Sequence, residues 1–174
     1  MSIDVFIYFI FLLINNIFEF SKIRIFKISN LAALNKERKN MTKRFLITIG
    51  LLGALSVALG AFGAHILRGN ISSENMETFN LANNYLMFHA LALLGIAFAN
   101  RYISRAYTNV IYYFFVIGIA LFSGSLLFVS LKELTGVGLG SLSFITPVGG
   151  FSLLLGWITL IFAGSSYTHN KGNK

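Results

Sequence analysis

Four long stretches of this chain contain no Asp, Glu, Lys or Arg and are dominated by Leu, Ile, Phe, Ala and Gly. These uncharged stretches cover residues 45–67, 78–100, 106–131 and 134–170. A helix needs about 20 mostly apolar residues to cross the hydrocarbon core of a bilayer. The pattern therefore predicts an all-α membrane protein, an antiparallel bundle of four transmembrane helices with spans at about 45–65, 84–103, 110–131 and 145–163.

Two other fold classes fit this pattern poorly. Spanning β-strands would alternate polar and apolar side chains with a period of two, and these stretches do not alternate. A soluble helical domain would carry charged residues along the exposed face of each helix. Only 11% of the 174 residues are charged, whereas soluble domains have about 25%, and 56% are hydrophobic.

From Met41 onward, the charged residues concentrate at the ends of the predicted spans. One end carries only basic residues, namely Lys43, Arg44, Arg101, Arg105, Lys171 and Lys174. The other end mixes both signs, with Arg68 and Lys132 beside Glu74, Glu77 and Glu133. Because basic residues favour the cytoplasmic side, this division predicts that both termini are cytoplasmic. The net charge of +8 is thus a topology signal, and no nucleic-acid partner is expected.

Residues 1–40 differ in composition from the rest of the chain, being rich in Phe, Ile and Asn. Their apolar run, residues 5–14, is too short to span a membrane, and a signal peptide would need a basic start and a small-residue cleavage site. The alternation of basic residues with Ile over residues 22–28 would suit an interfacial helix. We expect the natural chain to begin at Met41, which makes residues 1–40 an upstream extension. Alternatively, these residues form a disordered or interfacial segment. Residues 41–165 form the membrane domain, and residues 166–174 a cytoplasmic tail.

Small residues recur on one face of three predicted spans, at intervals of four or seven residues. In lipid, such residues let helices approach closely and so drive helix packing. They also make the bilayer, a second copy of the chain or other membrane proteins the expected partners. The residues expected at helix-packing faces are Ser56, Gly60, Ala64, Gly118, Ser125, Gly149 and Gly156.

Four short motifs follow one another along the chain: "GAFGAH" at 60–65, "YLMFHALAL" at 85–93, "FSGSL" at 122–126 and "ITPVGG" at 145–150. Together they resemble the YgdD/YwdK-type family of small bacterial inner-membrane proteins, a domain of unknown function related to an animal transmembrane protein. The resemblance extends from Met41 to the region of Ala163. It implies four spans in the bacterial plasma (inner) membrane and supplies no activity. Leu86 and Phe88 stand where many members have Gln and Tyr, so a hydrogen-bonding role for that Gln is not carried over.

Two histidines fall near the ends of predicted spans on the same side of the membrane. His65 closes the first span, and His89 lies about one helical turn into the second. Tyr85 precedes His89 by four residues and therefore shares its helix face. Thr146 begins the fourth span on this side. We expect these residues to form a polar cluster of His65, Tyr85, His89 and Thr146.

This cluster has three interpretations. Each imidazole could bond a backbone carbonyl or a hydroxyl and so lock the first two helices together. An ionisable residue within a span is also a candidate for a proton or small-solute pathway. A metal or bis-histidine haem site is the third, but no third ligand is evident. The chain has no Cys, which excludes disulfides, thiol catalysis and Cys-ligated metals, and no catalytic, cofactor-binding or metal residue is expected.

Local signals mark where two of the helices begin. "SSENMETF" places Ser72 or Ser73 as the N-cap of a helix that runs into the second span. Pro147 is tolerated in the first turn of the fourth span, where Thr146 would cap the helix. The alternative at Pro147 is a broken helix whose exposed amides face a substrate. Trp157 is expected to serve only in packing.

These observations favour a small integral plasma-membrane protein that is not an enzyme, and they indicate no specific activity or cofactor. The alternative is a small transporter or proton-coupled carrier that uses the histidine cluster. Four short helices are few for such a carrier, so it would be an oligomer. A membrane enzyme or a haem carrier ranks third.

Overall fold

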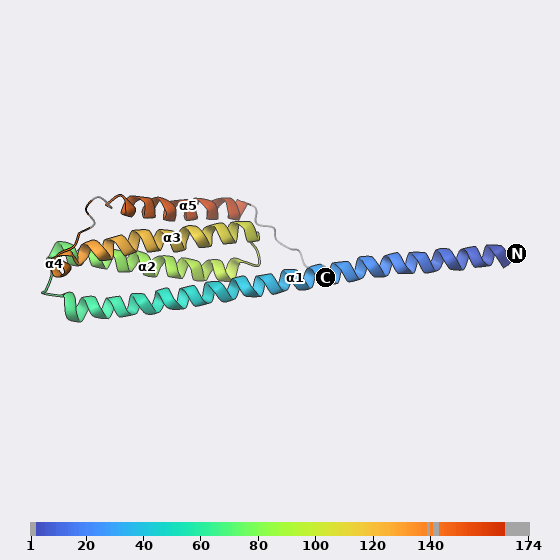
Figure 1. The fold of residues 1–174 in the computed structure, drawn as a ribbon, viewed down its shortest axis with the longest axis horizontal. Coiled ribbons are helices and arrows are strands. Elements are labelled where there is room, and N and C mark those ends of the chain that lie inside the picture. The colour runs from blue at the N-terminus through green and yellow to red at the C-terminus, as the bar shows by residue number, and fades with distance from the viewer. Residues whose placement is uncertain (1–2, 139, 141–142, 166–174) are drawn as a thin grey trace. The chain divides into compact units, whose positions relative to one another are not determined.

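A computed structural model describes residues 3–138, 140 and 143–165, and the predicted tail 166–174 lies outside them (Figure 1). Its elements are α1 (Ile3–Phe62), the π-helix η1 (Gly63–Leu67), α2 (Ser73–Ala99), α3 (Arg105–Ser130), α4 (Lys132–Thr135) and α5 (Ile145–Ser165). The prediction of an all-α chain with four spans is confirmed. Four helical segments of the described chain are long and apolar enough to cross a membrane: Phe26–Leu67, Ser73–Ala99, Arg105–Ser130 and Ile145–Ser165.

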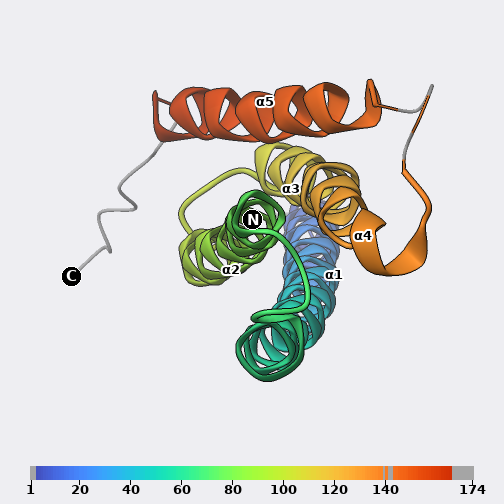
Figure 2. The same cartoon turned by 90° about the vertical axis from the view of Figure 1, so that its left-hand side faces the viewer.

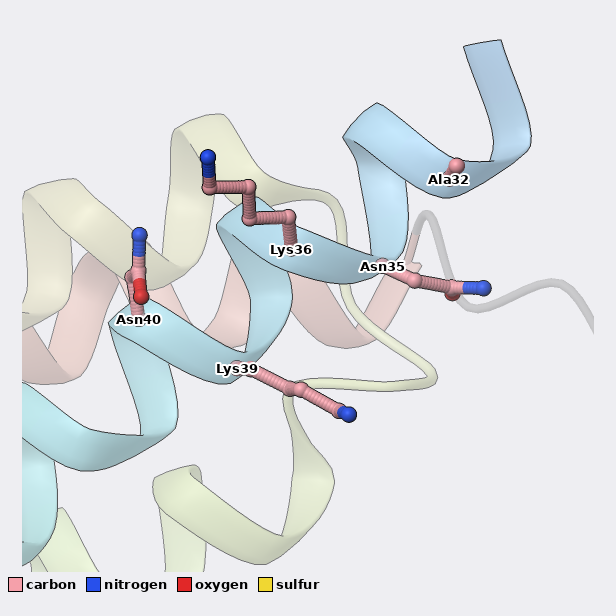
Figure 3. Close-up of a pocket in the computed structure, with 5 residues that line it drawn as sticks. All are labelled: Ala32, Asn35, Lys36, Lys39 and Asn40. Carbon is pink, nitrogen blue, oxygen red and sulfur yellow. The ribbon is translucent and has the colours of Figure 1, made fainter. Parts of the chain in front are cut away.

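The chain divides into two units, residues 1–41 and 42–174. The first unit is the N-terminal part of α1, whose side chains are exposed over residues 26–40. A shallow hollow follows one face of this helix and is lined by Ala32, Asn35, Lys36, Lys39 and Asn40 (Figure 3). Lys36 and Lys39 point in different directions, so their ammonium groups do not converge on a common ligand.

In the second unit, α3 lies between α2 and α5 (Figure 2). Serine side chains define where α2 and α3 begin. Ser72 Oγ accepts from Asn75 N at 3.3 Å, and Ser104 Oγ accepts from Tyr107 N at 3.5 Å. Such bonds satisfy amides that a helix N-terminus leaves unpaired. The predicted N-cap at Ser72 or Ser73 is therefore confirmed at Ser72.

Glycine lets α5 lie directly on α3, which it crosses obliquely (Figure 2). A β-carbon at Gly149 would overlap the backbone of Phe122, and one at Gly156 would overlap the ring of Phe115. On α3, a β-carbon at Gly118 would overlap Leu153. These three glycines therefore set the distance between the two helices, as small residues do in membrane proteins.

The small-residue row of α1 makes fewer contacts than its spacing predicts. Ser56 is buried and donates to Asn83 Oδ1 at 2.8 Å, and Gly60 lies beside the same Asn83. Ala64, expected on this packing face, is exposed instead. Ala64 lies in the π-helical turn Gly63–Leu67 that follows α1, in which Arg68 N donates to Gly63 O at 3.1 Å.

The start of α5 also differs from expectation. The sequence predicts Thr146 as the cap of this helix, but Thr146 lies inside the first turn, because α5 begins at Ile145 and Phe144 O already accepts from Val148 N at 3.2 Å. Pro147 occupies the same first turn, where its missing N–H breaks no helical hydrogen bond. The α5 helix is continuous over Ile145–Ser165, so the broken-helix alternative is not what the structure has.

Candidate functional site

His89 is buried near the middle of the bundle, 6% exposed, and both of its ring nitrogens have protein partners. Nδ1 lies 2.8 Å from the backbone oxygen of Tyr85, one turn earlier on α2. Nε2 accepts a hydrogen bond from the indole Nε1 of Trp157, at 3.2 Å. The imidazole therefore joins α2 to α5, two helices that are not consecutive in the chain.

These two bonds fix the protonation state of His89. A carbonyl oxygen can only accept, so Nδ1 must carry a hydrogen toward Tyr85 O. An indole N–H can only donate, so Nε2 must be an unprotonated acceptor. The arrangement thus requires the neutral imidazole with its hydrogen on Nδ1.

Aromatic rings enclose His89 on three helices. Its ring meets that of Phe115 edge-on, with centroids 5.2 Å apart, and that of Trp157 in the same manner at 6.0 Å. Tyr85 stacks over His89 at 5.8 Å and contacts Phe122 on α3 at 4.7 Å. Edge-to-face geometry of this kind is favourable beyond simple burial. Sequence reasoning assigns Trp157 to packing alone and so misses its hydrogen bond.

The four residues expected to cluster do not share one site. Tyr85 and His89 meet, but His65 is exposed on η1, and Thr146 bonds Ser125 at 2.7 Å on another interface. Ser125 itself donates to Phe122 O at 3.0 Å, so Thr146 is the donor to Ser125. The expectation of a cluster depends on His89 lying one turn into its span. In the structure Ser56 and Gly60 of α1 meet Asn83 of α2, so His89, six residues later, lies about 9 Å further from the η1 end that carries His65.

At one end of the bundle, Glu133 of α4 ties two connections together. Its Oε2 accepts from Ser72 N at 2.7 Å, and its Oε1 accepts from Ser72 Oγ at 2.7 Å and from Asn75 Nδ2 at 2.5 Å. These bonds, led by the one from the Ser72 hydroxyl, lower the pKa of the Glu133 carboxyl below its usual 4.5. We call this end, where α3 ends and α2 begins, the Glu133 end.

Polar side chains tie the membrane part of α1 to its neighbours. Thr48 Oγ1 and the Tyr112 hydroxyl lie 2.7 Å apart, and Asn100 Nδ2 donates to Thr42 Oγ1 at 2.9 Å. With the Ser56–Asn83 bond, these contacts join α1 to both α2 and α3. Interhelical bonds of this type hold helices together in lipid, where no hydrophobic drive operates between them.

Arg44 on α1 lies at the opposite end, where α2 ends and α3 begins; we call this the Arg44 end. Its Nη2 donates to Asn109 Oδ1 at 2.7 Å, and its Nη1 donates to the Tyr113 hydroxyl at 3.2 Å. The guanidinium carbon sits 4.2 Å from the centre of the Tyr112 ring and 5.2 Å from that of Tyr113. From the sequence, Arg44 is expected as a topology charge on the same side as Tyr112 and Tyr113, but its direct contacts with their rings and with Asn109 are not predicted.

The chemistry open to these groups is limited by what surrounds them. Within the residues that the structure describes, no three His, Asp or Glu side chains come together as a metal site would require. His89 could ligate a metal or haem, or pass on a proton, only by first giving up Tyr85 O or Trp157. As it stands, the His89 arrangement holds helices together.

Comparison with known proteins finds similarity to membrane proteins of unknown function. The model of a family described as protein of unknown function (DUF423) matches residues 59–150. The UPF0382 inner membrane protein YgdD of Escherichia coli K12 is 39% identical over 136 residues, which are 76% of this chain and 97% of that protein. The UPF0382 membrane protein YwdK of Bacillus subtilis 168 is 34% identical over 126 residues, 72% of this chain and 98% of that protein. No solved structure matches this chain.

Proposed function

Because this chain belongs to the DUF423 family of membrane proteins, we propose that it acts in the bacterial plasma membrane as a non-enzymatic helical bundle. Its role would be to associate with lipid or with other membrane proteins. The family resemblance carried by its four sequence motifs is confirmed by the same matches.

The observation that carries this proposal is the double engagement of His89. A proton relay needs a ring nitrogen that can exchange its hydrogen, and a metal or haem ligand needs a free lone pair. In this bundle Tyr85 O takes the Nδ1 hydrogen, and the Trp157 indole occupies the Nε2 lone pair. The close approach of α3 and α5 at Gly118, Gly149 and Gly156 supports the same view, because it makes a tightly packed interface.

The division of charge between the two ends supports an orientation with both termini of the bundle in the cytoplasm. Lys43, Arg44, Arg101 and Arg105 belong to the Arg44 end, whereas the acidic residues Glu74, Glu77 and Glu133 belong to the Glu133 end. Positive residues flanking spans favour the cytoplasmic face. The Arg44 end would then face the cytoplasm.

Orientation is testable by labelling, because the chain has no native cysteine. Single cysteines can be introduced at Val137, which is exposed beyond α4, and at Ala106, which is exposed at the start of α3. A membrane-impermeant maleimide added to intact spheroplasts should label Val137→Cys at once and Ala106→Cys only after permeabilisation. The reverse pattern would overturn the orientation.

The alternative of a proton carrier is tested in proteoliposomes that contain a trapped pH indicator. After a pH step, vesicles with the protein should change their internal pH no faster than empty vesicles. A proton flux that disappears in His89→Phe would establish the carrier alternative and overturn the proposal. Native mass spectrometry of the protein released from its own membrane adds an independent check, since a haem or metal adduct would also contradict it.

A further inference from the structure

We propose that Arg44 and Tyr113 form a recognition site for the phosphate of an anionic phospholipid headgroup at the Arg44 end of the bundle. The proposal adds a ligand site to the bundle and does not depend on which leaflet that end faces. The bundle holds the guanidinium of Arg44 in place through several contacts that do not neutralise its charge.

Among the residues that the structure describes, the groups that contact Arg44 are all neutral. Two of the contacts are hydrogen bonds to the Asn109 amide oxygen and the Tyr113 hydroxyl, and the others are with the faces of the Tyr112 and Tyr113 rings. These contacts hold the guanidinium in one orientation. None of them is with a carboxylate of the described chain, so the guanidinium keeps its full positive charge.

Carboxylates of the described bundle are too far away to serve as that partner. Glu133 follows the end of α3, whereas Asn109, which Arg44 contacts, lies in the second turn of the same helix. The intervening helix, from Asn109 to Ser130, is about 31 Å long. Glu74 and Glu77 begin α2 at the Glu133 end as well. A charge near hydrocarbon is costly without a counter-ion, and the carboxylates of the described bundle do not supply one to Arg44, so we expect an anion from outside the bundle to do so.

The surroundings place Arg44 at the level of lipid headgroups. Basic and aromatic side chains gather where the apolar helices end, as they do at membrane interfaces. Lys43 is exposed beside Arg44, and the guanidinium of Arg101 lies 5.8 Å from the centre of the exposed Tyr102 ring. Such basic surroundings favour an anionic lipid over a zwitterionic one, whose ammonium group would meet like charge.

The donors that remain suit a phosphate. Nη1 and Nη2 each donate one N–H to the protein and keep another for a ligand, whereas Nε is buried and out of a ligand's reach. Tyr113 is 53% exposed, and its hydroxyl accepts from Arg44, so its own hydrogen is available to a ligand. Arginine and phosphate form strong charge-assisted hydrogen bonds, which a lysine cannot match in geometry. A headgroup phosphate can therefore accept from Arg44 and Tyr113 together.

The test is a titration of the full-length protein in neutral detergent with short-chain phosphatidylglycerol, followed by native mass spectrometry. Arg44→Gln should weaken binding at least about tenfold, equivalent to about 1.4 kcal/mol. Lys43→Gln is the matched control, because it removes the same charge from the neighbouring, exposed position. It should weaken binding no more than about twofold, as expected for loss of a screened surface charge. Equal losses in the two variants would show nonspecific attraction and overturn the site.

A second variant and a comparison of ligands test the site independently of Arg44→Gln. Tyr113→Phe removes only an exposed hydroxyl, so the bundle should stay folded, and it should still weaken binding about threefold. Unchanged binding in Tyr113→Phe would contradict the two-residue site. Phosphatidylcholine and inorganic phosphate serve as alternative ligands and should each bind at least about tenfold more weakly than phosphatidylglycerol. Equal binding of phosphatidylcholine would refute headgroup selectivity, and equal binding of inorganic phosphate would show a free-phosphate site in place of a lipid one.

Discussion

Trp157 donates its indole hydrogen to Nε2 of His89 across 3.2 Å, and this single bond joins α5 to α2 past the intervening α3. The other ring nitrogen of His89, Nδ1, donates to the backbone oxygen of Tyr85 on its own helix, α2. A fully bonded polar group in a low-dielectric interior gives a packing arrangement its specificity, because any other arrangement leaves that group unpaired. His89 thus aligns the outermost pair of helices in the α2–α3–α5 layer.

Removing the indole donor should loosen this connection. Trp157→Phe leaves Nε2 of His89 buried without a partner, so we expect the bundle to lose about 1 kcal/mol of unfolding free energy. The measurement is reversible unfolding in mixed micelles of increasing SDS content. In a His89→Phe background the same substitution should cost less, since no acceptor remains. Equal costs in both backgrounds would show that the hydrogen bond is not what Trp157 contributes.

The α3–α5 interface should not tolerate a single added methyl group at Gly149. The new β-carbon would meet the backbone of Phe122, which cannot turn aside as a side chain can, so we expect a loss of roughly 1–3 kcal/mol. Gly124→Ala on α3 is the matched control, because no atom lies within 4 Å of the position that its methyl group would take. That control should be neutral or slightly stabilising, because alanine favours helix more than glycine does. A similar loss at both positions would point to helix flexibility instead of contact.

The Glu133 end should weaken in acid. Because Ser72 and Asn75 bond the carboxylate, the pKa of Glu133 is lower in the folded protein than in the unfolded chain. Its contribution is therefore complete above the unfolded pKa and is lost as the pH falls through the lower, folded pKa. Thermal unfolding of the reconstituted protein between neutral and acidic pH should show this loss.

Glu133→Gln should remove most of that pH dependence and make the wild-type and variant curves converge at low pH. Glu77→Gln, an exposed carboxyl on α2, is the comparison and should leave the wild-type pH profile nearly unchanged. If Glu77→Gln flattened the profile as much as Glu133→Gln, the Ser72–Glu133 contact would not be its source.

Much of this architecture can be predicted from the sequence, because the bilayer imposes simple requirements. Uncharged stretches long enough to span predict the four helices, and the spacing of Gly149 and Gly156 predicts the α5 packing face. Ser72 predicts the start of α2, because few residues satisfy exposed helix amides as well as serine does. Each of these signals is local or periodic.

The contacts around His89 and Arg44 could not be predicted in this way. Trp157 lies 68 residues from His89, and no spacing rule connects residues on non-consecutive helices. Arg44 reaches Asn109 across 65 residues, again through tertiary packing alone. The predicted depth of His89 is wrong for a related reason. His65 and His89 are expected on the same side of the membrane, but Ser56 and Gly60 of α1 meet Asn83 of α2, and this register, which moves His89 away from the η1 end, is set by tertiary packing.

The most direct test of the structural role of His89 is the protonation of its ring nitrogens. Solid-state 15N NMR of the protein in bilayers at neutral pH measures this protonation. The substitutions His65→Gln and His169→Gln leave His89 as the only histidine in the sequence. The structure predicts one protonated nitrogen, Nδ1, and one unprotonated nitrogen, Nε2, whose chemical shift changes when Trp157 is replaced by Phe. A protonated Nε2, or a charged ring, would contradict the bond to Trp157 and with it the assignment of His89 as a helix-joining residue.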